Sequence, residues 1–342
     1  MARTVTHRYV DPLTQVWLHA AARIGLRVVR TPDAYATTDG AGTLALSDAA
    51  GFDADDCAAQ MIFHELCHSL VQGAAAFEQP DWGLDVAGLD AWREHACLRA
   101  QHVLAGRHGL RGVLAPTTDF RAFWDALPAD ALADRSDRSV VAAIVAVQRA
   151  EEQPWAPALD DALVATARIA AIATPHAEPG TLLALAAPAR AAHPSGLPAG
   201  DADGTCGTCA WRYATPTQSR CRHTVARVDP AWPACERYEA ALDCQTCGAC
   251  CRSAYQSVEV ARRDRVVRRQ PALVVDRGTY LELARAGDRC AALAGGELDG
   301  DRVGRYHCRI YDDRPRTCRD FTLGGDHCLT ARRRVGLTLG PA

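Results

Sequence analysis

His64-Glu65-Leu66-Cys67-His68 decides the fold expected for the first third of the chain. Residues four apart on a helix share one face, so the imidazoles of His64 and His68 lie close enough to hold one Zn²⁺. Glu65 then stands where its carboxylate reaches a water on that metal. The motif predicts a zinc hydrolase site, with two histidine ligands and Glu65 as the catalytic base that takes the proton of the water.

The residues around this motif predict a buried helix over 58–71. Asp53 or Asp55 is expected to cap its start, and Gly73 is expected to end it. The apolar side chains recur at helical spacing: Ile62, Phe63, Leu66 and Leu70.

A catalytic zinc site needs a third protein ligand, because three ligands leave the fourth position for water. Glu94 is the first candidate, in the alanine-containing stretch 90–100 that predicts a second helix. Asp85, Asp90 and His95 stay open as alternatives.

With His64, Glu65, His68 and Glu94 in place, residues 1–130 resemble the gluzincins, peptidases in which HExxH is followed by a glutamate on the next helix. The chain departs from that pattern at Leu98, where such peptidases often carry an acidic residue that orients a ligand. The resemblance implies a peptide or protein substrate.

A strand is expected before the motif helix. Residues 43–47 alternate as an edge strand, which in such peptidases pairs with an extended substrate. An oxyanion partner is sought among Tyr35, His95 and His102. Cys67 and Cys97 are expected near the metal, as small core residues or in a redox or ligand role.

Cysteines concentrate in the last third of the chain. Of 15, three precede residue 200 and the other 12 lie between Cys206 and Cys328. We find no segment typical of a signal peptide or a membrane span, which favours a cytoplasmic protein. In that compartment thiols are more often metal ligands than disulfides.

The first cysteine group has one CxxC pair and two further thiols: Cys206, Cys209, Cys221 and Cys235. Four thiolates suit a tetrahedral Zn²⁺ or an iron-sulfur cluster, and the spacing does not choose between them. Over some 35 residues this group resembles small high-potential-type cluster modules found beside some radical enzymes.

The second group begins with a CxxCxxCC motif and has eight cysteines: Cys244, Cys247, Cys250, Cys251, Cys290, Cys308, Cys318 and Cys328. From Cys244 to about Leu339 it closely resembles the YkgJ-type cysteine-cluster family, described as binding zinc or iron-sulfur centres. Eight thiolates exceed one mononuclear site, so the resemblance implies a multinuclear centre or two adjacent sites. The alternative is a metal that only folds a module with a small core.

Length and composition limit the number of domains and the kinds of partner and chemistry. The 342 residues suffice for two or three domains, and the net charge of −3 favours neither a membrane nor a nucleic acid as partner. All 38 basic residues are arginine, which excludes lysine nucleophiles. We expect a mainly α protein with a small α+β zincin-like N-terminal domain and cysteine-rich, metal-stabilised C-terminal modules. The expected segments are 1–130 (metallopeptidase), 131–185 (Ala-rich helical extension), 186–204 (linker), 205–240 (four-cysteine module) and 241–342 (CxxCxxCC domain).

Together these patterns predict a zinc-dependent peptidase-like hydrolase fused to zinc- or iron-sulfur-binding cysteine modules. The alternative is a non-hydrolytic metal-binding or electron-transfer protein, or an iron-dependent oxidase, because two imidazoles and one carboxylate also suit iron. A redox protein or another metalloprotein is then the expected partner.

Overall fold

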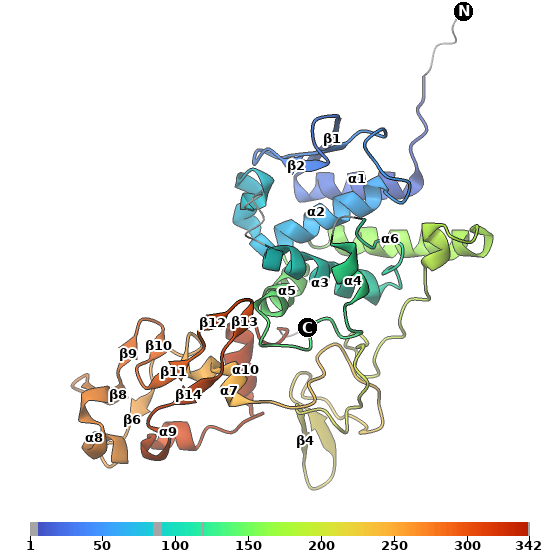
Figure 1. The fold of residues 1–342 in the computed structure, drawn as a ribbon. Helices are drawn as coiled ribbons and strands as arrows, with labels where there is room; N and C mark the ends of the chain where they lie inside the picture. The colour runs from blue at the N-terminus through green and yellow to red at the C-terminus, as the bar shows by residue number, and fades with distance from the viewer. Residues whose placement is uncertain (1–5, 85–90, 118–119, 341–342) are drawn as a thin grey trace, which may run out of the picture. The chain divides into compact units, whose positions relative to one another are not determined.

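The computed structural model describes residues 6–84, 91–117 and 120–340. Its internal contacts divide the chain into two compact units (Figure 1). The first unit contains Met1–Ala131 and Val145–Ala191, and the second contains Leu132–Ile144 and Ala192–Ala342. The expected helical extension therefore falls largely in the first unit, and both cysteine segments fall in the second.

A three-stranded sheet lies in the first unit, in the order β1-β3-β2 (β1, Arg27–Thr31; β2, Ala36–Thr38; β3, Thr43–Ser47). Strand β3 pairs in parallel with β1 and antiparallel with β2. It is the central strand, so the prediction of an edge strand at 43–47 is wrong. Its side chains Leu44 and Leu46 are fully buried, and both of its backbone edges are occupied.

The motif helix is α2 (Ala58–Gln72), close to the predicted bounds. Its first turn is capped by Cys57, not by Asp53 or Asp55, because a cap must directly precede the helix. The Cys57 sulfur accepts the Gln60 backbone N–H at 3.4 Å, and the Gln60 side chain accepts the Cys57 N–H at 3.4 Å. Gly73, at φ 91°, ends the helix as predicted.

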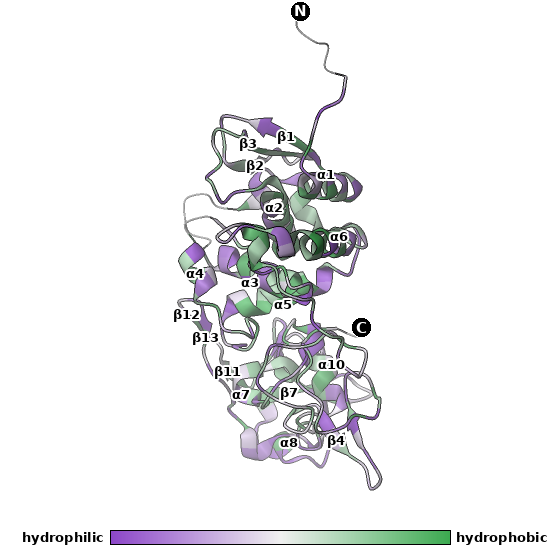
Figure 2. Ribbon diagram, turned by 90° about the vertical axis from the view of Figure 1, so that its right-hand side faces the viewer, coloured by the Kyte–Doolittle hydropathy of each residue, from purple (hydrophilic) through white to green (hydrophobic). Residues whose placement is uncertain are grey.

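The other helices of the first unit pack around α2. Helices α1 and α3 contact α2, and α6 contacts α1. Trp17 donates its indole N–H to Thr166 at 3.0 Å, and Arg149 donates to the Leu70 carbonyl at 2.7 Å. The hydrophobic colouring of α3 and α6 in Figure 2 marks this core. The bounds are α1 Pro12–Ile24, α3 Ala91–Arg107, α4 Arg121–Asp125, α5 Arg138–Arg149 (which begins in the second unit) and α6 Ala158–Ala173.

The second unit consists of short elements joined by coil, and its sheets have two or three strands. The pairs are β4–β5, β9–β10, β11–β14 and β12–β13, and β6-β8-β7 forms the three-stranded sheet. The helices are α7 Cys244–Cys247, α8 Arg265–Arg269, α9 Arg316–Arg319 and α10 Asp326–Arg334. The strands are β4 Arg212–Ala214, β5 Ser219–Cys221, β6 Glu259–Val260, β7 Val274–Asp276, β8 Leu281–Leu283, β9 Arg285–Ala286, β10 Arg289–Cys290, β11 Leu293–Gly295, β12 Leu298–Asp299, β13 Arg302–Val303 and β14 Tyr306–Cys308.

The fold is thus mixed α and β, with small sheets throughout. Over the described residues, every helix is too short or too polar to cross a lipid bilayer.

Candidate metal centres

Two histidines and a glutamate meet where α2 packs against α3. The Nε2 atoms of His64 and His68 lie 3.2 Å apart. Glu94 faces both, with one oxygen 3.4 Å from the Nε2 of His64 and the other 3.3 Å from that of His68. With Cys97 added, the ligand atoms all lie within 4.8 Å of one another, and no other group of described residues is this compact.

The hydrogen bonding of this group is incomplete without a cation. Two Nε2 atoms that face each other cannot both use their lone pairs in one contact. Among the described residues, the Nδ1 of His68 and one oxygen of Glu94 have no hydrogen-bond partner, although both are buried. Burial lowers the pKa of His68, which favours the neutral imidazole that binds metals. Two imidazole nitrogens and a carboxylate therefore fit one zinc or iron ion.

Gln101 supports the first histidine, which the sequence had not indicated. The fully buried Gln101 side chain places its Oε1 2.9 Å from the His64 Nδ1 and donates to the Leu114 carbonyl at 2.7 Å. Because Gln101 is seven residues after Glu94, it lies two turns along the same face of α3. The position four after Glu94, where an acidic partner was sought, is the fully buried Leu98.

Glu65 is held by Trp82, another residue that the sequence had not indicated. The Trp82 indole N–H donates to Glu65 Oε2 at 2.7 Å, and both side chains are buried. Asp81 and Trp82 have positive φ values of 48° and 57°, which bulky residues adopt at a cost of about 1–3 kcal/mol each. Strand β2 supports this turn, because Thr37 donates to Asp81 at 2.6 Å and Thr38 Oγ1 accepts the Trp82 N–H.

The other side chains considered for this site have partners of their own. The ring of His95 stacks on Phe123 at 3.9 Å, and that of His102 meets Trp124 edge-on at 5.1 Å. Tyr35 donates to Asp56, and burial together with that bond raises its pKa to about 12.

Of the two cysteines expected near the metal, Cys97 lies beside His64 and Cys67 contacts Cys97. Cys97 Sγ lies 3.8 Å from the His64 Nδ1. Burial, followed by contact with Cys67, raises the pKa of Cys97. Asp85 and Asp90 lie outside the described residues.

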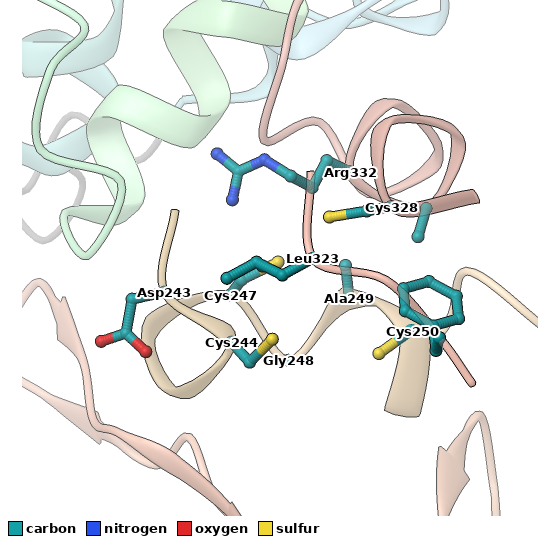
Figure 3. A pocket seen from close by; sticks show the side chains of 11 residues that line it. Asp243, Cys244, Cys247, Gly248, Ala249, Cys250, Leu323, Cys328 and Arg332 are labelled. Carbon is teal, nitrogen blue, oxygen red and sulfur yellow. The ribbon is translucent and has the colours of Figure 1, made fainter. Parts of the chain in front are cut away.

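In the second unit the eight CxxCxxCC thiols separate into two sets of four. The first set lines one pocket, into which its sulfur atoms point (Figure 3): Cys244, Cys247, Cys250 and Cys328. The second set packs together in the hydrophobic cluster around Leu283: Cys251, Cys290, Cys308 and Cys318. The sets meet at Cys250 and Cys251, whose sulfur atoms are 3.8 Å apart.

Two of these thiols ionise less readily than a free cysteine. Burial raises the pKa of Cys244 to about 11 and that of Cys318 to about 12. Because only the thiolate binds metal strongly, a bound cation must supply the stabilisation that water would otherwise give. Each set offers four thiols, a donor set that fits a zinc or iron ion.

A cavity of about 700 Å³ lies against these cysteines. Its wall includes Cys251 and Cys318 beside Tyr306 and Phe321. The volume is in the range of small-molecule sites. Thiols of both sets, among them Cys250 and Cys251, therefore lie on a cavity that a ligand can enter.

The segment before this domain brings its four cysteines to one pocket. Cys206, Cys209, Cys221 and Cys235 line it together with His193 and His223. Here too burial raises thiol pKa values, to about 11 for Cys206 and about 12 for Cys235.

Comparison with known proteins confirms the predicted cysteine-cluster resemblance. Residues 243–333 match the family model CxxCxxCC, described as "Putative zinc- or iron-chelating domain". The chain is similar to "Uncharacterized protein YkgJ" of Escherichia coli O157:H7, with 33% identity over 106 residues. That alignment covers 28% of this chain and 93% of the relative. No solved structure matches the chain significantly.

Proposed function

Because the chain belongs to the CxxCxxCC family through residues 243–333, we propose that it is a metal-dependent peptide hydrolase joined to a metal-chelating cysteine domain. One observation carries the hydrolase part: the Nε2 atoms of His64 and His68 lie 3.2 Å apart and both face Glu94. The order of sheet, HExxH helix and glutamate helix supports a gluzincin-like site.

Each residue of the site has its own role in the proposed hydrolysis. A bound zinc ion would supply Lewis acidity, which activates water and polarises a carbonyl. Glu65 would accept the proton of the attacking water and pass it to the leaving amine. The Trp82 N–H fixes one Glu65 oxygen, so that the other is left to take the proton. Gln101 orients the His64 ring.

We assign to strand β2 the pairing with substrate that the sequence had suggested for residues 43–47. It is an edge strand, whereas β3 is central. Its residues Thr37 and Thr38 also form hydrogen bonds with the turn that places Trp82 against Glu65. An extended peptide that pairs with this edge is the proposed substrate.

The cysteine domain chelates zinc or iron through its two sets of four thiols. In this proposal Cys250 and Cys251 belong to different but adjacent sites, since Cys250 lines the pocket of the first set and Cys251 packs in the hydrophobic cluster of the second.

The test combines metal content with hydrolysis of a fluorescence-quenched peptide library. We expect Glu65→Gln to retain its metal and lose hydrolysis, because the base is removed and the ligands stay. The double variant His64→Ala, His68→Ala should lose about one zinc per chain. His176→Ala, which changes an exposed histidine, serves as the control and should keep both. Full hydrolysis by Glu65→Gln would refute the proposed mechanism.

The same donor set supports a second candidate, a redox protein with iron in this site. Two histidines and one carboxylate are also the ligands of non-haem iron. In that case the double histidine variant would lose iron in place of zinc, and Glu65→Gln would be without effect on the redox activity of the site.

A further inference from the structure

Arg237 is a buried cation with two unpaired nitrogens among the described residues. Its side chain lines the pocket of Cys206, Cys209, Cys221 and Cys235, and the residue is 5% exposed. Its Nε and Nη1 have no hydrogen-bond partner in the part of the chain that the structure describes. A buried guanidinium is strongly unfavourable unless an anion or acceptor faces it.

A second nitrogen at the same pocket lacks a partner as well. The buried Nε2 of His223 has no partner among the residues with described positions. Its Nδ1 lies 3.3 Å from the Arg333 guanidinium. Neutral thiols would not offset this positive charge. Four thiolates around a metal centre carry a net negative charge and offer sulfur atoms as acceptors.

The spacing of the thiols distinguishes two kinds of centre. A tetrahedral zinc ion with Zn–S bonds of about 2.3 Å places its sulfur ligands about 3.8 Å apart. Within the described ranges, no three of these cysteines bring their sulfur atoms within 4.8 Å of one another. In a [4Fe–4S] cluster each cysteine binds a different iron, so the sulfur atoms lie farther apart.

We propose that Cys206, Cys209, Cys221 and Cys235 hold an iron-sulfur cluster and that Arg237 offsets its negative charge through N–H···S hydrogen bonds. This centre lies outside residues 243–333, which match the chelating family. It is independent of the hydrolase site, which is in the other unit.

The local fold agrees with a centre of this kind. Between residues 192 and 240 the regular structure consists of the three-residue strands β4 and β5. Such a segment gains much of its folding free energy from bound metal.

The first test compares full-length protein purified without oxygen with the variant Cys206→Ser, Cys209→Ser. We expect the variant to lose iron and acid-labile sulfide in equal amounts, together with part of the visible absorption. Cys57→Ser, in the other unit, is the control and should lose neither. Loss of zinc alone, or no loss of metal, would overturn the proposal, and peptide hydrolysis plays no part in this readout.

The second test addresses Arg237. Removing its charge and donors in Arg237→Met should disfavour the reduced cluster about tenfold, a shift of about −59 mV for one electron. Arg237→Lys keeps the charge and should shift the potential less. An unchanged potential in Arg237→Met with the cluster intact would overturn the role of Arg237. If Arg237→Met does not fold, an unchanged potential and EPR spectrum in Arg237→Lys count against that role, because lysine lacks the planar set of donors.

Discussion

Replacing Gln101 by leucine should weaken metal binding at the histidine site by about 10- to 100-fold. Leucine is similar in size but cannot accept the His64 Nδ1–H, which Gln101 now meets at 2.9 Å. The ring then loses the bond that fixes its tautomer and orientation. The expected factor corresponds to about 1.4–2.7 kcal/mol of binding free energy. A single hydrogen bond to a charged group has a similar magnitude, about 1.5–3 kcal/mol.

The substitution has a second effect that must be separated from the first. Gln101 also donates to the Leu114 carbonyl, so its loss leaves a buried acceptor without a partner and costs about 1–3 kcal/mol of stability. Thr166→Val is the matched control, because it removes the buried bond from Trp17 in the same unit. It should lower stability and leave metal affinity unchanged.

Zinc affinity is measured by competition with a chromophoric chelator, and the variant His64→Ala, His68→Ala gives the baseline from the cysteine sites. An affinity in Gln101→Leu within twofold of the wild type would refute the assignment of Gln101 as a support of the metal ligand.

Three further predictions concern Trp82, Tyr35 and the cysteine sets. Trp82→Phe should lower the unfolding free energy by about 1.5–3 kcal/mol in denaturant titrations and leave zinc content unchanged, because the bond to Glu65 is lost and no metal ligand changes; equal stability would contradict it. Between pH 10 and 12 the unfolded chain releases the Tyr35 proton that the folded chain keeps, so stability should fall as pH rises through this window. Tyr35→Phe should abolish that contribution. The phenolate absorbance of the wild type minus that of the variant should rise with a midpoint near pH 12 and not near pH 10. Of the two CxxCxxCC sets, Cys328→Ser should release the metal of the first and keep that of the second, and Cys318→Ser should do the reverse; complete loss from both sets in both variants would show a single shared centre.

Helical periodicity was sufficient to predict α2, since its apolar positions and its ending glycine are local signals. The position of Glu94 beside the motif also follows from two amphipathic helices packed together. Trp82 was not predictable, because its role depends on two consecutive residues with positive φ that join strand β2 to Glu65. The central position of β3 depends on a parallel pairing with β1, which the alternation of its own residues does not reveal.

The cysteine spacing similarly predicted metal binding but not how the thiols are shared. Cys250 lines the pocket of the first set and its neighbour Cys251 packs in the hydrophobic cluster of the second, although both also line one larger cavity. Their partners come from strands and helices up to some 80 residues away, so that the division depends on tertiary packing. Gly248, at φ 59°, directs the chain here, and a Cβ at this residue would lie 2.8 Å from the Tyr306 ring.

The two kinds of cysteine centre share one buried residue, Trp211. Cys328 of the first CxxCxxCC set forms a hydrophobic cluster with Trp211, and Cys209 of the four-cysteine pocket packs against the same cluster. Because Cys328 and Cys209 pack in one cluster with a fully buried indole, we expect that ordering one centre also orders part of the other. Binding free energies at coupled sites are reciprocal, so each centre should strengthen metal binding at the other by the same factor.

Cys328→Ser should therefore accelerate loss of iron from the four-cysteine pocket to a chelator, although it changes no ligand there. Cys318→Ser is the matched control, because Cys318 packs in a different hydrophobic cluster. Equal rates of iron loss in the two variants would show that Trp211 separates the centres without coupling them.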